Sequence, residues 1–402
     1  MGLEKFQIFF DLNPAVFYSG RIVTGRIVVV TSTPKKLRGI YVKIKGESHV
    51  RWTTRQNKHT RVHQAFENYF NNKFAVFGRA DGEETLEPGE YSFPFYYTLP
   101  KNLPSSFEGD FGFIRYTLKA VMERPWKFDH KAKVLFTVIC PLDLNSFPHL
   151  LNPVVKQKVK KFCCFCCNSG PVKIVLSIPT GGGVPGETLL PTLDVENNSR
   201  VNLNRITLKL IKWATYKAAS GLTRDFQRLV VVQNLGRLAS GQSSTFERAA
   251  LTIPALPPSC LWHCNIINLD YIIEVSFTPS GCHRKFKVRI PLVVGTIPLR
   301  QNFPLYSQVL PNPPPRQSFA QFSEVPPVPP VHQNLYSEDP TNQPLRQGLT
   351  PQSDAPPSYA DLAPPSYEES VFGAKNVFDD SEDRHTFGER NFAPLYPVYY
   401  KP

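Results

Sequence analysis

The feature that most constrains the fold is a local pattern that occurs twice, 154 residues apart. Residues 98–105 contain Thr-Leu-Pro followed by Pro-Ser, and residues 252–259 contain Thr-Ile-Pro followed by Pro-Ser at the same spacing. A strand-like segment with a tyrosine follows each copy, at Tyr116 and Tyr271. Because a fixed offset between matching segments indicates a duplicated unit, the chain is predicted to contain two related domains in tandem.

Short strands separated by turn residues are predicted in both halves. Residues 39–45 alternate between apolar and polar side chains, which places Ile40, Val42 and Ile44 on one face of a strand. Pro and Gly recur between such segments, and the first half contains no convincing amphipathic helix. This pattern favours an all-β fold of two tandem immunoglobulin-like antiparallel β-sandwiches. Residues 51–89, rich in Arg, Lys, Asn and His, are expected to form a long hairpin or loop.

Changes in composition divide the chain into four parts. The predicted parts are an N-terminal domain at residues 1–150, a basic, cysteine-rich linker at 151–170, a C-terminal domain at 171–300 and a tail at 301–402. The tail holds 19 of the 39 prolines, and it cannot bury enough apolar surface to offset its ordering entropy, so we expect it to be disordered. With neither a signal peptide nor an apolar run of about eighteen residues, the protein is expected to be cytoplasmic or peripheral to a membrane.

Charge is distributed unevenly between the body and the tail. Residues 1–300 contain 40 Lys and Arg against 21 Asp and Glu, whereas residues 301–402 contain six against twelve. A strongly basic body suits an anionic partner, and three are open at this point: the inner leaflet of a membrane, a phosphorylated peptide and a nucleic acid. For any single basic cluster, a surface that is merely solvated is an equal alternative.

The predicted linker contains two clusters of side chains. Its lysines are Lys156, Lys158, Lys160 and Lys161, and its cysteines are Cys163, Cys164, Cys166 and Cys167. S-acylation of the cysteines beside the lysines would supply the two signals that hold a protein on an anionic membrane. A zinc site needs about four thiolates in tetrahedral geometry, which adjacent cysteines make awkward. Ordinary unmodified thiols are the third interpretation.

The tail contains the sequence Pro-Pro-Ser-Tyr twice. The first motif comprises Pro356, Pro357 and Tyr359, and the second comprises Pro364, Pro365 and Tyr367. Adjacent prolines fix the polyproline II conformation, which fits the aromatic-lined groove of a WW domain, and the tyrosine fills a neighbouring slot. Low-complexity sequence that repeats by chance is the alternative, but two identical copies favour WW-domain binding. The short gap between the motifs leaves open whether both are occupied at once.

Together these features resemble the alpha-arrestins, the arrestin-domain-containing branch of the arrestin superfamily. The resemblance covers residues 6–299 as two arrestin domains and continues into the tail. It is carried by residues 18–25, 40–46 with Trp52, 107–120 and 123–126 in the first half, and by residues 170–171, 185–187, 197–199 and 291–295 in the second.

The resemblance implies an adaptor without enzymatic activity. Family members hold a membrane cargo, such as a receptor or a transporter, with the arrestin body, and their tails recruit WW-domain-bearing HECT-type ubiquitin ligases. The cargo is then ubiquitinated and internalised or sorted at endosomes. The protein is therefore expected in the cytoplasm and peripherally at the plasma membrane and endosomes, with no cofactor, no metal and no nucleic-acid partner.

Two other classes of function are alternatives. One is a coat-like trafficking scaffold of arrestin fold, for which the tail motifs would be incidental. The other is an enzyme built on a β-scaffold. The sequence contains no Gly-x-Ser-x-Gly, His-Glu-x-x-His or Walker-type motif, so it nominates no catalytic residue.

Overall fold

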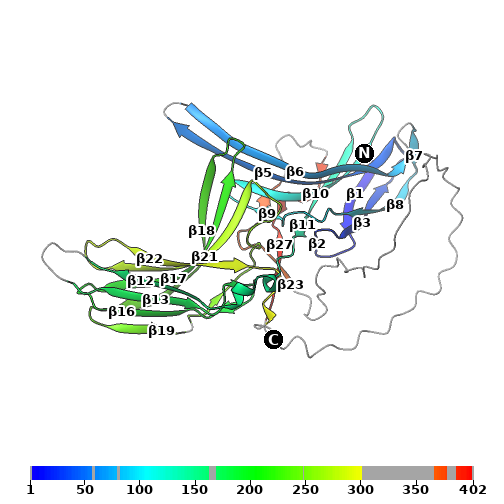
Figure 1. Ribbon diagram of the computed structural model, residues 1–402. Helices are drawn as coiled ribbons and strands as arrows, with labels where there is room; N and C mark the ends of the chain where they lie inside the picture. Colours follow the sequence, from blue (N-terminus) through cyan, green and yellow to red (C-terminus); the bar gives the residue numbers. More distant parts are fainter. Residues whose placement is uncertain are drawn as a thin grey trace, which may run out of the picture. The chain divides into compact units, whose positions relative to one another are not determined.

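The computed structural model describes residues 2–56, 59–78, 82–162, 169–247, 249–300, 366–377 and 386–400. Over these residues the regular structure consists of β-strands and two short 3₁₀ helices, Leu144–Ser146 and Pro148–Leu151. Residues 1–303 and 365–402 belong to one compact unit. Figure 1 shows one group of strands in blue and cyan and another in green and yellow. The predicted all-β fold with two β-sandwiches is confirmed.

The first sandwich consists of two sheets. One sheet has the order β1–β3–β8, formed by Leu3–Phe10, Ile22–Thr31 and Gly89–Thr98. The other has the order β2–β11–β10–β5–β6, formed by Val16–Tyr18, His130–Ile139, Gly112–Glu123, Gly39–Gln56 and His59–Gly78. Short strands complete the domain: β4 (Lys35–Leu37) pairs with β7 (Glu84–Leu86), and β9 (Phe107–Glu108) pairs with β10. Ile40, Val42 and Ile44 are all fully buried, as their alternation predicts.

The second sandwich follows the same scheme. Its first sheet has the order β12–β13–β16–β19, formed by Val154–Lys160, Val172–Ile178, Thr192–Asn197 and Ser243–Phe246. Its second has the order β14–β22–β21–β17–β18, formed by Gly182–Gly183, Phe286–Val294, Ile267–Pro279, Leu203–Lys217 and Thr223–Leu238. The short strands β15 (Thr188–Leu189) and β20 (Leu251–Thr252) pair with each other.

The repeated Pro-Ser pattern performs the same structural task in both sandwiches. The Ser105 hydroxyl oxygen accepts a hydrogen bond from the backbone N–H of Cys140 at 2.8 Å. The Ser259 hydroxyl oxygen accepts one from the backbone N–H of Val294 at 2.9 Å. In each domain the serine therefore satisfies a backbone donor at the end of a strand, β11 in the first sandwich and β22 in the second.

The tyrosine that follows each copy is also equivalent. Tyr116 is fully buried and donates its hydroxyl proton to the Pro104 carbonyl at 2.6 Å. Tyr271 is 1% exposed and donates to the Pro257 carbonyl at 2.8 Å. A buried hydroxyl is costly without a partner, so the carbonyl of the Pro-rich segment and the tyrosine of the next strand depend on each other. This explains why the two elements recur together in the sequence.

A long hairpin of β5 and β6 extends from the first sandwich (Figure 1). Trp52 on β5 stacks on His63 of β6, with ring centroids 5.3 Å apart. Two points along β6 bond to the second sandwich. The Gln64 carbonyl accepts a hydrogen bond from the Ala219 N–H at 3.0 Å. The Glu67 carboxylate accepts one from the Asn265 side chain at 2.9 Å. The hairpin therefore joins the two sandwiches.

Part of the predicted linker is a strand of the second sandwich. Residues 154–160 form β12, which pairs along its whole length with β13, from Val154 opposite Ile178 to Lys160 opposite Val172. Its valines supply the β-branched side chains that favour a sheet edge over an open linker. Cys163, Cys164, Cys166 and Cys167 lie outside the described residues.

The expectation of a disordered tail needs correction over its last part. Five short strands form there: β23 (Ser366–Glu369), β24 (Lys375–Asn376), β25 (Thr386–Phe387), β26 (Asn391–Phe392) and β27 (Leu395–Val398). β23 pairs with β27, and β25 pairs with β11 of the first sandwich. The physical reason is local composition, because Tyr396, Val398 and Tyr399 are all at least 96% buried. Aromatic burial of this size offsets the ordering entropy that the average composition of the tail cannot.

Candidate docking sites

The strand β27 is docked on the first sandwich. Tyr396 is 1% exposed and packs in a small cluster with Val16 and Ile139. Its hydroxyl donates to the Ser106 carbonyl at 2.9 Å. Ser106 follows the serine of the Pro-Ser repeat, so the docked strand uses a carbonyl that the repeated element holds in place. Truncating a buried aromatic side chain of this kind costs about 3–5 kcal/mol, which makes Tyr396 the main anchor of the segment.

The next residues of the same segment bond to the second sandwich. The Tyr399 N–H donates to the Pro185 carbonyl at 2.8 Å, and the Tyr399 hydroxyl donates to the Thr296 carbonyl at 2.6 Å. Gly186 has φ of +88°, and a Cβ atom there would lie 2.1 Å from the Tyr399 carbonyl oxygen. Glycine is therefore required at this turn for both backbone conformation and space. Residues 395–399 thus contact both sandwiches.

The second Pro-Pro-Ser-Tyr motif ends inside this docked structure. Tyr367 lies on β23 opposite Pro397 of β27. It is partly buried beside Tyr396, and its hydroxyl lies 3.1 Å from the hydroxyl of Tyr18. Burial, together with the neighbouring Tyr18, raises the pKa of Tyr367 above the usual range of a tyrosine. Pro364 and Pro365 of this motif, and Pro356, Pro357 and Tyr359 of the first motif, lie outside the described residues.

A cluster of charged groups lies where β9, β17, β18 and the tail meet. Lys212 on β17 is 2% exposed, with its ammonium nitrogen 3.5 Å from the ring centre of Phe372 and 5.1 Å from that of Phe107. Burial lowers the pKa of Lys212 to about 7, assisted by the positive charges of Arg228 and Lys375 and opposed by Asp110. A lysine held between two aromatic faces gains cation–π attraction but loses most of its hydration.

The same cluster ties the tail to the first sandwich. Glu108 is 4% exposed and accepts two hydrogen bonds from the Arg115 guanidinium, at 2.6 and 3.0 Å. Burial raises the pKa of Glu108, and the adjacent Arg115 opposes that rise. Lys375 of the tail donates to the Gly109 carbonyl. On the next strand, the buried Lys133 donates to the Val377 carbonyl at 3.0 Å. Residues 372–377 are thus held by charged side chains as well as by packing.

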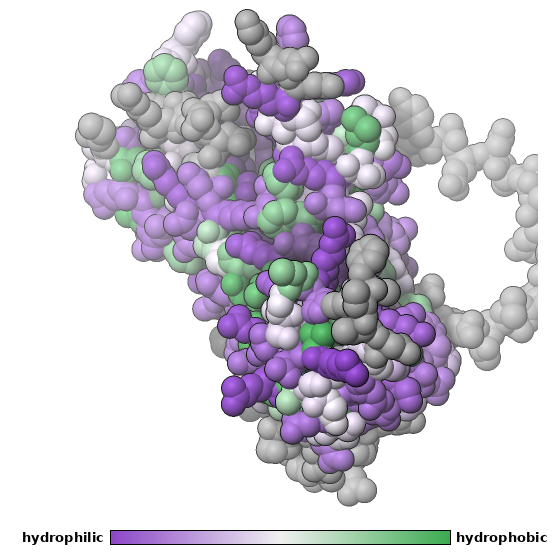
Figure 2. All heavy atoms as spheres, turned by 90° about the vertical axis from the view of Figure 1, so that its left-hand side faces the viewer, coloured by the Kyte–Doolittle hydropathy of each residue, from purple (hydrophilic) through white to green (hydrophobic). Residues whose placement is uncertain are grey.

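The predicted membrane-contact lysines occupy an edge strand. β12 is the outer strand of its sheet, and Lys156, Lys158 and Lys160 alternate along it. Lys156 and Lys161 are exposed, whereas the Lys158 ammonium donates to the Lys287 carbonyl at 2.9 Å and that of Lys160 lies 5.9 Å from the ring centre of Phe162. The face of the molecule in Figure 2 is mainly hydrophilic, with isolated hydrophobic areas.

Catalytic and metal-binding arrangements were sought over the same described residues. There, no group of three or more His, Cys, Asp or Glu side chains is placed to hold a metal ion. Within that part of the chain, no helix is long and apolar enough to cross a membrane. The buried charges described above are paired across the junction of the sandwiches, an arrangement that fits a structural or switching role.

Two family models match the chain. The N-terminal domain of arrestin (or S-antigen) matches residues 6–145, and the C-terminal domain matches residues 168–299. This chain belongs to the alpha-arrestin family of arrestin-domain proteins. Arrestin domain-containing protein 17 of Caenorhabditis elegans is 30% identical over 99% of both chains. Arrestin domain-containing protein 4 of Homo sapiens is 32% identical over 72% of this chain and 71% of its own length.

Two functional features of this alpha-arrestin escape the sequence reasoning. The docked residues 395–399 were included in a tail whose average composition is polar and Pro-rich, although the run Leu-Tyr-Pro-Val-Tyr-Tyr at 395–400 is a local signal of burial. Lys212 lies between Ile211 and Trp213 in a strand, and its burial depends on the position of Phe372, 160 residues later. No local pattern indicates that contact.

Proposed function

We propose that this alpha-arrestin is a non-enzymatic adaptor that links membrane cargo to HECT-type ubiquitin ligases. The arrestin body would hold a receptor or transporter, and the two Pro-Pro-Ser-Tyr motifs would bind WW domains of the ligase. The duplicated motif beside a complete pair of arrestin domains is the observation that carries this proposal. The protein would act in the cytoplasm and peripherally at the plasma membrane and endosomes, promoting cargo ubiquitination, endocytosis and sorting.

The position of Tyr367 makes the two motifs inequivalent in this proposal. A WW domain takes the tyrosine of its ligand into a slot of its own. Tyr367 is paired in β23 and bonded to Tyr18, so it cannot fill that slot while β23 and β27 are docked. The first motif would therefore recruit the ligase initially. The second would contribute only after the docked segment is released, which makes avidity conditional rather than permanent.

Isothermal titration calorimetry with a tandem WW fragment of a HECT ligase tests ligase recruitment. The chain is compared with its Tyr359→Ala, Tyr367→Ala and double variants. We expect the double variant to lose binding, Tyr359→Ala to lose most of it, and Tyr367→Ala to lose little. Undiminished binding by the double variant would show that the motifs are incidental, as for a coat-like scaffold.

Point variants are better suited to this question than truncation. Deleting residues 301–402 would also remove the docked strand β27 and its contacts to both sandwiches. Loss of cargo binding in such a truncation would therefore not distinguish a missing motif from a disturbed body. Proximity labelling in cells with the intact chain and the Tyr359→Ala, Tyr367→Ala variant separates the two ends. Ligases should disappear from the labelled proteins while cargo remains.

Membrane contact by the basic strand is a second element of the proposal. Lys156, Lys158, Lys160 and Lys161 would face an anionic leaflet, and acylation at Cys163, Cys164, Cys166 and Cys167 would strengthen the attachment. Joint replacement of the four lysines by alanine should weaken binding to anionic vesicles, and unchanged binding would refute this element. Hydroxylamine-sensitive acyl labelling of the chain, lost in a variant with four serines at the cysteine positions, tests acylation.

A further inference from the structure

The loop between β10 and β11 displays two large aromatic side chains to solvent. Trp126 is 97% exposed and Phe128 is 75% exposed, and the residue between them, Lys127, is exposed as well. Tryptophan is usually among the well-buried side chains of a folded protein. Two adjacent exposed aromatics on one short turn therefore require an explanation beyond the stability of the fold.

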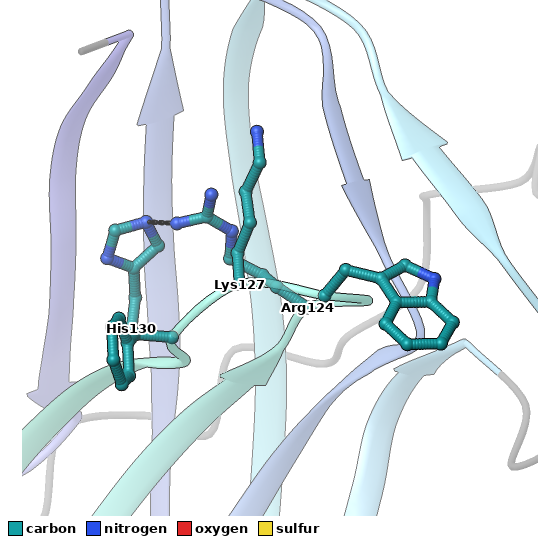
Figure 3. A pocket seen from close by; sticks show the side chains of 5 residues that line it. Arg124, Lys127 and His130 are labelled. Carbon is teal, nitrogen blue, oxygen red and sulfur yellow. Dashed lines mark hydrogen bonds between the residues drawn. The ribbon is translucent and has the colours of Figure 1, made fainter.

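The loop is ordered so that it keeps this display. The Asp129 carboxylate accepts a hydrogen bond from the Arg124 N–H at 3.1 Å, which closes the turn from residue 124 to 129. The Arg124 guanidinium lies 2.5 Å from the His130 ring, and Figure 3 shows these two side chains pointing toward each other while Lys127 points away. Trp126 has φ of +58°, a left-handed conformation that bulky residues rarely adopt. Strain of this kind is retained where it serves a function.

Positive charges accompany the aromatic tip. Arg124 and Lys127 belong to the loop itself, and the exposed Arg38 is bonded to its base through its backbone N–H, which donates to the Glu123 carbonyl at 2.8 Å. The one carboxylate within the loop, that of Asp129, is engaged in closing the turn. The tip therefore combines aromatic side chains with cations that are free to reach beyond them along their own flexible stems.

We propose that this loop is a membrane-docking element that inserts Trp126 and Phe128 into the interfacial region of a bilayer containing anionic phospholipids. Indole rings prefer the level of the lipid headgroups, and phenylalanine gains by entering the adjoining acyl region. Arg124 and Lys127 lie beside the headgroups, where each cation is attracted by the negative surface potential. This contact is separate from ligase recruitment and from the basic strand β12, and it would orient the first sandwich against the membrane that carries the cargo.

Vesicle binding by the full chain made in bacteria, where its cysteines are not S-acylated, tests the proposal. The probes are vesicles of phosphatidylcholine alone and of phosphatidylcholine with 30% phosphatidylserine. We expect the Trp126→Ala, Phe128→Ala variant to bind the anionic vesicles at least tenfold more weakly than the parent chain. Trp262→Ala, which removes another exposed tryptophan at 44% exposure, is the matched control and should bind like the parent.

Brominated lipids supply an independent readout that loss of folding cannot imitate. Bromine quenches only tryptophans that enter the bilayer, so quenching in the parent chain should disappear in Trp126→Phe and persist in Trp262→Phe. Equal vesicle binding by the parent and the double-alanine variant would overturn the proposal. Absence of quenching would overturn it too, and a double-alanine variant that keeps vesicle binding but loses cargo would assign the loop to a protein partner instead.

Discussion

Releasing the docked strand β27 should strengthen WW-domain binding at the second motif. Tyr396→Ala is the most direct perturbation, because this side chain is 1% exposed and bonds to Ser106. Losing a buried aromatic ring and its hydrogen bond would weaken docking by about 3 kcal/mol. Apparent affinity scales with the fraction of molecules in which Tyr367 is accessible, and 1.4 kcal/mol corresponds to a factor of ten. The dissociation constant should therefore fall by about a hundredfold, up to the limit set by the free motif.

The assay isolates the second motif. A single WW domain is titrated into chains in which the first motif is silenced by Tyr359→Ala, with and without Tyr396→Ala. A synthetic peptide of residues 360–372 gives the affinity of the undocked motif. Tyr96→Ala, which removes a 78% exposed tyrosine from β8, is the control and should change nothing. Our reasoning is refuted if the chain with an intact Tyr396 already binds the WW domain as tightly as the peptide does.

Three further predictions concern the junction and the core. Gly186→Ala should release residues 395–399 and expose them to limited proteolysis, since a Cβ atom would lie 2.1 Å from the Tyr399 carbonyl oxygen; an unchanged digestion pattern would contradict this. Because burial lowers the pKa of Lys212 to about 7, the unfolded chain binds a proton that the folded chain lacks between about pH 7 and pH 10. Denaturant unfolding should therefore show stability rising with pH in that window by at most about 1.4 kcal/mol per pH unit, and Lys212→Met should abolish this contribution. Tyr116→Phe and Tyr271→Phe should each lower the free energy of unfolding by about 1–3 kcal/mol, because each leaves an equivalent buried carbonyl without its donor; clearly unequal losses would argue against the duplicated role.

The sequence was most informative where local pattern and local structure coincide. Alternation at Ile40, Val42 and Ile44 predicts a strand face because the period of side chains along a strand is fixed by the backbone. The repeated Pro-Ser and tyrosine predict two related domains because each copy meets the same hydrogen-bonding requirement of one sandwich. Both features depend on partners within a single domain.

Contacts between distant segments were not predictable in the same way. Tyr396 is buried only because Val16 and Ile139, more than 250 residues earlier in the chain, form its cluster. Average composition over 301–402 gave a correct warning about proline and charge but concealed a short aromatic run at its end. Of the candidate site residues, Tyr367 was identified by its motif, whereas its engagement with Tyr18 follows from tertiary structure alone.

The long hairpin of β5 and β6 acts as a lever arm on the domain junction. Its contacts with the second sandwich are at Gln64 and Glu67, while the strand continues outward to His59. At about 3.3 Å per residue, the eight residues from Glu67 to His59 give an arm of roughly 26 Å. A ligand that pulls on the outer end exerts a torque that the hydrogen bonds of Asn265 and Ala219 must resist. Binding far from the junction can therefore alter the angle between the sandwiches without touching the second one.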